Sequence, residues 1–271
     1  MSKGFRLLRL EYLFSVLIPC LLSIYLNDYD IIANFWIIAG FGFYAITGNT
    51  LNDAIDMKDP NEKETLERVK GYSRKEILVL AIASFLLGTM CFINIILLNP
   101  ILGVYLTIIV FMVIFYCLFK SLVIINHIIL GVSHIILPYF MIKIYAGDVF
   151  LNIFPEMGLY ESLILAAITA VAFTGQMVHE MIDDHSLAKL KPRTSRLVIW
   201  VACVISLSIA IISFIITKYL IFLPIVFFPI GIMYIYRKPR MDLLGRTSLK
   251  DVGIILGNFM LAYLIVLIIA P

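Results

Sequence analysis

Long apolar runs follow one another along the whole chain, separated by short polar segments. A helix that crosses the hydrocarbon core of a membrane needs about 20 mostly apolar residues, so each run of that length predicts a spanning helix. The pattern predicts nine spanning helices in a single helical domain, residues 1–271. They are expected at residues 8–26, 31–51, 77–98, 101–119, 123–145, 160–182, 197–217, 219–236 and 252–270.

The composition agrees with this pattern and excludes several classes of protein. Of the 271 residues, 62% are hydrophobic and only 14% are charged, whereas a soluble domain carries roughly a quarter charged residues. A soluble enzyme, a disordered chain and a coiled coil are therefore excluded. The net charge of +3 is small and dispersed, so it does not indicate nucleic-acid binding. The four cysteines lie inside apolar runs without paired spacing, as expected of buried residues rather than disulfides or metal ligands.

The positions of lysine and arginine predict the orientation of the chain. Basic residues are enriched in the cytosolic segments of membrane proteins. With a cytosolic N-terminus and nine crossings, 19 of the 21 basic residues fall on the cytosolic side. The C-terminus is then expected outside, and the two longest polar loops, about residues 52–76 and 183–196, are expected in the cytosol.

Acidic residues gather at the end of the second predicted span. If the helix continues to Asp59, then Asn49, Asn52, Asp56 and Asp59 lie within an arc of about 80°, with Asp53 beside it. Carboxylates that close repel one another unless a cation lies between them. Oxygen ligands of this kind suit Mg²⁺, which typically shares its coordination shell with substrate phosphates.

A second group of acids, Glu180, Asp183 and Asp184, ends the sixth predicted span. Both groups are expected on the cytosolic side, which predicts a metal site bounded by two helix ends. Basic residues that can bind a diphosphate are expected on that side too: Arg68, Lys70, Lys120, Lys189, Lys191 and Arg193.

Other charged residues have simpler interpretations. The three glutamates within residues 62–67 are typical of a solvated loop. Arg9 and Glu11 are equally consistent with a local ion pair at the surface, and Lys120 with a topological anchor.

The first motif and a later Tyr-Lys pair resemble the UbiA superfamily of intramembrane prenyltransferases, over nearly the whole chain. The family's NDxxDxxxD motif is matched by Asn52, Asp53 and Asp56, with the final acid one position early at Asp59. Its YxxxK motif is matched by Tyr116 and Lys120.

The second family motif, HQxxDxxxD, is matched less closely. His179 and Asp183 fit, and Glu180 takes the position of Gln. Leu187 stands where the second Asp is expected, and Glu180 with Asp184 would form a shifted acidic pair.

The resemblance implies an all-α integral membrane fold with nine transmembrane helices around a central lipid-accessible cavity. It implies Mg²⁺-dependent transfer of a prenyl group from a prenyl diphosphate to a lipophilic acceptor, which is an aromatic compound, a quinone precursor or a lipid. The residues expected to bind the metal are Asn52, Asp53, Asp56, Asp59, Glu180, Asp183 and Asp184. Those expected to bind substrate are Asn49, Arg68, Tyr116, Lys120 and Lys189, and those expected in catalysis are Asp56, Asp183 and Lys120.

Three alternatives stay open at this point. A terpene cyclase of the same superfamily would act on the prenyl diphosphate alone, and a non-catalytic protein would only bind isoprenoids. A transporter is disfavoured, because no internal repeat and no acid near the middle of a span are visible. The acceptor and the oligomeric state are not specified by the sequence.

Overall fold

The computed structural model describes residues 3–60, 62–119, 123–147, 153–182, 187, 190–237 and 243–270. Within these ranges the secondary structure is helical and no strand occurs. Seven helices are long and apolar enough to cross a membrane, so the chain is a multi-pass integral membrane protein. These helices cover Arg6–Asn27, Arg74–Leu98, Ile101–Leu118, Ile125–Ala146, Leu159–Val178, Pro192–Thr217 and Asp251–Ile269.

The predicted number of nine spans is not confirmed. The predicted span 31–51 coincides with helix α3 (Phe35–Asp56), which is 22 residues long but ends in polar turns. The predicted span 219–236 coincides with a shorter apolar stretch, Leu220–Ile235. Both segments are helical as expected, and they differ from the other seven in apolarity or length.

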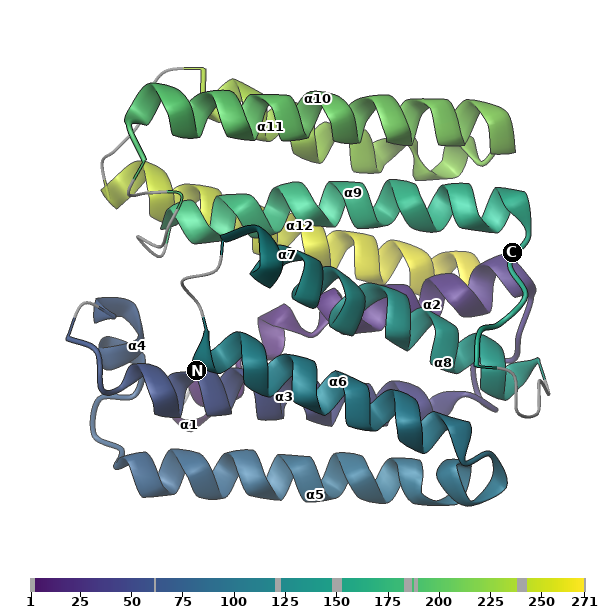
Figure 1. Cartoon of the computed structure of the whole chain (residues 1–271), viewed down its shortest axis with the longest axis horizontal. Helices are drawn as coiled ribbons and strands as arrows, with labels where there is room; N and C mark the ends of the chain where they lie inside the picture. The colour runs from purple at the N-terminus through teal and green to yellow at the C-terminus, as the bar shows by residue number, and fades with distance from the viewer. Residues whose placement is uncertain are drawn as a thin grey trace. The chain divides into compact units, whose positions relative to one another are not determined.

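The helices form two compact units, and each is described by itself. The first comprises Met1–Phe119, Val132–Pro155 and Leu261–Pro271. In it α3 packs along α5 (Arg74–Leu98), and the two helices lie side by side in Figure 1. Helix α2 (Phe14–Asn27) packs on α8 (Leu137–Ala146). Its other helices are α1 (Lys3–Leu8), η1 (Leu10–Tyr12), α4 (Lys63–Arg68), α6 (Ile101–Leu118) and the π-helix η2 (Val132–Ile136).

The second unit comprises Lys120–Gly131 and Glu156–Met260. Its main pairing is between α9 (Leu159–Ile182) and α10 (Pro192–Thr217), which run side by side in Figure 1. Its other helices are α7 (Val123–Gly131), η3 (Leu220–Val226) and α11 (Phe227–Ile235), and the last helix of the chain is α12 (Leu243–Ile269). The prediction of a single domain stays a prediction.

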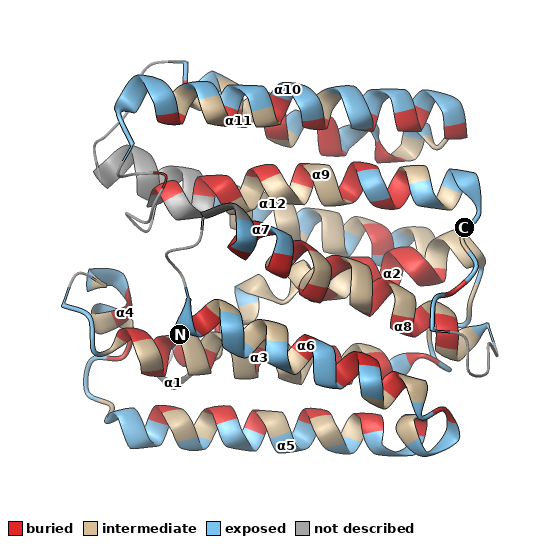
Figure 2. Cartoon of the chain, viewed as in Figure 1, coloured by how far each residue is buried: buried red, intermediate tan, exposed pale blue. Residues whose placement is uncertain are grey.

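Glycines allow the backbones of α3 and α5 to approach closely. A Cβ atom at Gly88 of α5 would lie 2.4 Å from the Tyr44 ring of α3, and one at Gly40 would lie 2.5 Å from the ring of Phe92. Small residues serve the same purpose at many helix contacts inside membranes. Buried and exposed residues alternate along α5 in Figure 2, as expected of a helix with one face on a neighbour.

We expect Gly88→Ala to lower the stability of the protein by about 1–3 kcal/mol, because the added methyl group meets a packed ring. The measurement is the thermal unfolding temperature in detergent. Gly42→Ala is the matched control, since a Cβ atom there meets nothing within 4 Å and alanine is the better helix former. Equal unfolding temperatures for the two variants would contradict the close packing of α3 on α5.

Candidate functional site

The last turn of α3 carries Asn52, Asp53 and Asp56. Asp53 is fully buried and Asp56 is 7% exposed. The Asn52 amide nitrogen Nδ2 donates a hydrogen bond to Oδ2 of Asp56 at 2.7 Å. Because an ionised carboxylate only accepts hydrogen bonds, this contact sets the orientation of the amide. The other amide atom, Oδ1 of Asn52, is buried without a hydrogen-bond partner among the described residues.

The carboxylate of Asp53 is held by an arginine from the following loop. Arg68 of α4 donates from Nε to Oδ2 at 2.9 Å and from Nη2 to Oδ1 at 2.7 Å. Burial by itself would lower the pKa of Arg68, but its hydrogen bonds and ion pair with Asp53 outweigh that effect and the pKa lies above its ordinary value. Arg68 therefore stays charged, and this bidentate contact orders α4 against the end of α3.

A second arginine reaches Asp53 from the N-terminal segment. Arg9 lies 3.5 Å from Oδ1 of Asp53 through its Nη1 atom, and its guanidinium covers the Tyr12 ring at 4.5 Å. Its left-handed backbone (φ 48°, ψ 44°) separates α1 from η1. Arg9 is only 8% exposed, so its interpretation as one half of a surface ion pair is wrong. No periodicity in the sequence pointed to this contact, because it requires the N-terminal segment to fold onto α3.

The arrangement combines oxygen ligands with two arginine side chains. One buried carboxylate, Asp53, faces two guanidinium groups, while Asn52 and Asp56 are joined by a hydrogen bond near the end of the same helix. Among the described residues, no three His, Cys, Asp or Glu side chains gather as a ready metal site. That is compatible with Mg²⁺, which is commonly bound by one or two carboxylates together with substrate phosphates. The buried, unpartnered Asn52 oxygen fits such an ion.

Asn49 and Asp59 flank this turn at different positions. Asn49 is half-buried about one turn earlier on α3. Helix α3 ends at Asp56, so the helical arc that was extrapolated to Asp59 does not extend that far. Asp59 is exposed in the following turn, where its backbone nitrogen donates to the carbonyl of Asp56 at 2.9 Å. A part for Asn49 and Asp59 in binding stays a prediction.

The sequence of this helical chain is similar to one protein family over most of its length. The sequence matches the model of the UbiA prenyltransferase family over residues 16–248. The chain belongs to this family. The predicted resemblance to the UbiA family is thereby confirmed. None of the curated proteins matches the sequence significantly.

Solved structures of UbiA proteins share the fold over the whole chain. A UbiA homologue from Archaeoglobus fulgidus bound to GPP and Mg²⁺ is 16% identical, with 98% of this chain and 99% of that chain covered and a TM-score of 0.68. The same homologue bound to DMAPP and Mg²⁺ is 16% identical, with both chains fully covered (100%) and a TM-score of 0.69. A structure described for digeranylgeranylglyceryl phosphate synthase is 16% identical over 100% of both chains, with a TM-score of 0.57.

Several predicted site residues lie outside the described residues: Lys120 of the YxxxK motif, Asp183 and Asp184 of the second motif, and Lys189 after it. Glu180 lies in the last turn of α9, and its side chain is also outside the description. Tyr116 is half-buried near the end of α6. The roles of these six residues therefore stay predictions.

Leu187, at the position where UbiA proteins are expected to carry the second Asp, is part of an apolar core. It is 2% exposed and belongs to a buried cluster of the second unit. The Ser195 hydroxyl donates to the carbonyl oxygen of Leu187 at 2.8 Å, which anchors the loop at this point. The other members of the cluster are Met177, Val178, Met181, Ile199, Cys203, Ile232 and Tyr236. At this position the chain packs a side chain instead of offering an oxygen ligand.

Proposed function

We propose that this UbiA protein transfers a prenyl group from a prenyl diphosphate to a lipophilic acceptor, with Mg²⁺ as its cofactor. The observation that carries the proposal is the last turn of α3. There an unpartnered buried amide oxygen and the Asp56 carboxylate lie beside an arginine–carboxylate pair. Membership of the UbiA prenyltransferase family supports the reaction class. The names of the solved homologue's ligands, GPP and DMAPP with Mg²⁺, support the donor class.

In this proposal Asn52 and Asp56 would hold Mg²⁺, and the ion would supply positive charge to stabilise the leaving diphosphate. Asp53 is occupied by Arg68 in the structure, at 2.7 and 2.9 Å. A diphosphate would compete with the Asp53 carboxylate for the Arg68 guanidinium. Both groups offer pairs of oxygen atoms that can accept two parallel hydrogen bonds from an arginine. Transfer of Arg68 to the diphosphate would release Asp53 for the metal. Arg9 then keeps Asp53 in place.

The remaining predicted residues take supporting roles. Glu180, Asp183 and Asp184 are proposed to bind metal from the second motif, with Asp59 supporting the first. Asn49, Tyr116, Lys120 and Lys189 are proposed to contact the substrates, and Asp183 and Lys120 to act with Asp56 in catalysis. The carbon–oxygen bond of the donor breaks with both electrons leaving on diphosphate, and the acceptor attacks the allylic cation and then loses a proton. The apolar surroundings of the membrane exclude water from that cation.

The site is proposed to lie near the cytosolic face, with the N-terminus in the cytosol and the C-terminus outside. The placement of 19 of 21 basic residues supports this orientation. Single cysteines introduced at exposed positions on each side, such as Lys70 and Lys218, would be labelled from opposite sides of sealed vesicles.

A second candidate is a non-catalytic isoprenoid-binding protein. The observation that favours it is Leu187, which is buried in an apolar cluster at a motif position where an acid is expected. The Asn52, Asp53 and Asp56 turn argues for catalysis, because a protein that only binds a prenyl tail has no need of buried oxygen ligands at a helix end.

The proposal is tested with the purified full-length protein in lipid nanodiscs with Mg²⁺. Labelled prenyl diphosphates of several chain lengths are offered with and without a mixture of lipophilic acceptors, and the products are identified by mass spectrometry. We expect a prenylated acceptor and one diphosphate released for each transfer. A cyclised hydrocarbon or alcohol formed without acceptor would identify a cyclase. Binding of the donors without diphosphate release would identify the non-catalytic protein.

A further inference from the structure

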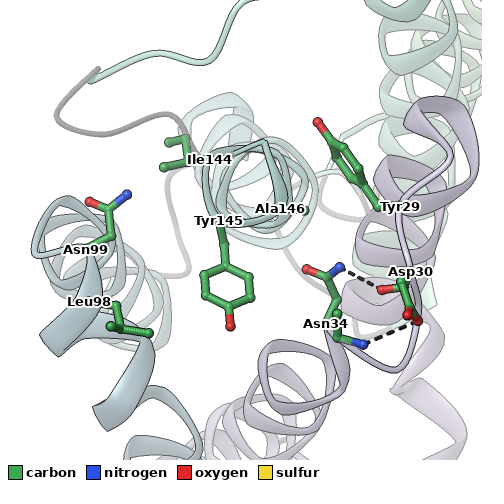
Figure 3. A pocket seen from close by; sticks show the side chains of 9 residues that line it. Tyr29, Asp30, Asn34, Leu98, Asn99, Ile144, Tyr145 and Ala146 are labelled. Carbon is green, nitrogen blue, oxygen red and sulfur yellow. Dashed lines mark hydrogen bonds between the residues drawn. The ribbon is translucent and has the colours of Figure 1, made fainter.

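A pocket of about 490 Å³ opens at the N-terminal end of α3 (Figure 3). It lies within the first unit and is lined by residues of the α2–α3 turn, the end of α5 and the end of α8. Helix α3 has 22 residues, and at a rise of 1.5 Å per residue its two ends are about 33 Å apart. The pocket is therefore remote from the Asp53 and Asp56 turn.

Asn34, one of the residues that line this pocket, carries an unpartnered acceptor. Asn34 is 2% exposed, and its Nδ2 donates to the backbone carbonyl of Asp30 at 2.8 Å. Since a carbonyl can only accept, the opposite atom of the amide is the oxygen. This Oδ1 atom is buried and has no hydrogen-bond partner among the described residues. Figure 3 shows it pointing away from Asp30.

The charge beside this acceptor is negative. Oδ1 of Asp30 accepts from the backbone nitrogens of Ile32 at 2.6 Å and Ala33 at 3.4 Å. These contacts hold the turn and leave Oδ2 without a bond among the described residues. None of the residues lining the pocket is basic. A ligand that carries only negative charge would be repelled here, whereas an ammonium group with several N–H donors would satisfy both oxygens at once, also as the cationic end of a zwitterionic headgroup.

The surroundings of the pocket are apolar and exposed. Leu98 lines it and is 64% exposed, while Phe35 and Trp36, which follow Asn34, are 53% and 60% exposed. In a multi-pass membrane protein such side chains contact lipid, and aromatic residues near a helix end are typical of the membrane–water interface. A ligand that combines a polar cationic head with acyl chains fits this border.

We propose that the pocket binds the headgroup of a phospholipid with a primary ammonium group, of which phosphatidylethanolamine is the simplest. Its ammonium donates to Oδ1 of Asn34 and to the Asp30 carboxylate, and its acyl chains lie against the apolar residues beside the pocket. This site is separate from the proposed prenyl-transfer site and does not depend on it.

The test compares two zwitterionic lipids whose headgroups differ at the nitrogen. Native mass spectrometry of the full-length protein would measure binding of phosphatidylethanolamine and of phosphatidylcholine with the same acyl chains. The trimethylated head of phosphatidylcholine is also cationic but carries no N–H group. We expect phosphatidylethanolamine to bind about tenfold more tightly, in line with charge-assisted hydrogen bonds. Equal binding of the two lipids by the wild-type protein would overturn the proposal and leave water as the partner of Asn34.

Two variants test whether Asp30 causes the preference for phosphatidylethanolamine, and a soluble probe tests whether the ligand is a membrane lipid. Asp30→Asn keeps an oxygen for the turn and removes the charge, so the preference should fall to about twofold or less. Asp28→Asn is the matched control, because Asp28 is exposed and does not line the pocket. An undiminished preference in Asp30→Asn would overturn the site. Soluble glycerophosphoethanolamine should bind far more weakly than the lipid, and equal binding would overturn the membrane lipid as the ligand.

Discussion

Asp56→Ala is expected to reduce Mg²⁺-dependent release of diphosphate from a prenyl donor by about 10³-fold, to the background rate. Asp56 is 7% exposed and accepts from Asn52 at 2.7 Å, so the variant loses one metal ligand and the partner that orients the other. In the proposed mechanism, these residues would act chiefly by electrostatic stabilisation of the leaving diphosphate. Release of diphosphate from a labelled donor is measured directly by chromatography over a range of Mg²⁺ concentrations.

Two further variants separate metal binding from folding. Asp56→Asn keeps the shape of the side chain but loses its charge, so raised Mg²⁺ should restore part of its activity. Glu67→Ala removes an exposed carboxylate of α4 and should leave the rate unchanged. If the Asp56→Ala variant released diphosphate at the wild-type rate in the presence of EDTA, the mechanism would be contradicted. It would not affect the assignment of the chain to the UbiA family.

Leu187→Asp, the change towards the family pattern, is expected to lower the stability of the protein by about 3–5 kcal/mol and to bring no gain in activity. The carboxyl group would replace a side chain that is 2% exposed among methionine, valine and isoleucine. An acid in such a cluster has no partner for its charge, and its desolvation is not compensated. The unfolding temperature in detergent is the measurement.

The matched control is Leu190→Asp, three residues along the same loop. Leu190 is 42% exposed, so the same acid can remain hydrated there and should cost little. A Leu187→Asp protein as stable as the control, or more active than the wild type, would show that the loop can turn this position towards the metal. Leu187 would then be a lost ligand rather than a core residue.

The positions of the helices were predictable from local pattern, and their exact character was not. Apolar runs located every one of the seven long helices, because an apolar run of that length has few alternatives in a bilayer. The predicted count of nine is not confirmed, since α3 mixes an apolar start with a polar end and the 220–235 stretch is short. Apolarity along the chain does not say how deep such segments lie.

For the candidate site, too, local sequence pattern predicted some features and not others. Asn52 and Asp56 lie four residues apart on one helix, so helical periodicity alone is enough to bring them together. The helix was extrapolated to Asp59 in the sequence analysis, but α3 ends at Asp56. Arg68 was expected to bind diphosphate, yet in the structure it binds Asp53. In the second motif, Leu187 is buried in an apolar cluster, and Asp183 and Asp184 lie outside the described residues.

By itself the sequence determined the membrane as the solvent, the helical class, the family and the Asn52–Asp56 turn, because each depends on residues close in the chain. The tertiary structure decided the partners. It brought Arg9 and Arg68 to the buried carboxylate of Asp53, placed Leu187 in an apolar cluster and left the Asn34 oxygen facing a pocket. These contacts join segments distant in sequence, and a buried charge or amide takes its partner from whatever the fold places beside it.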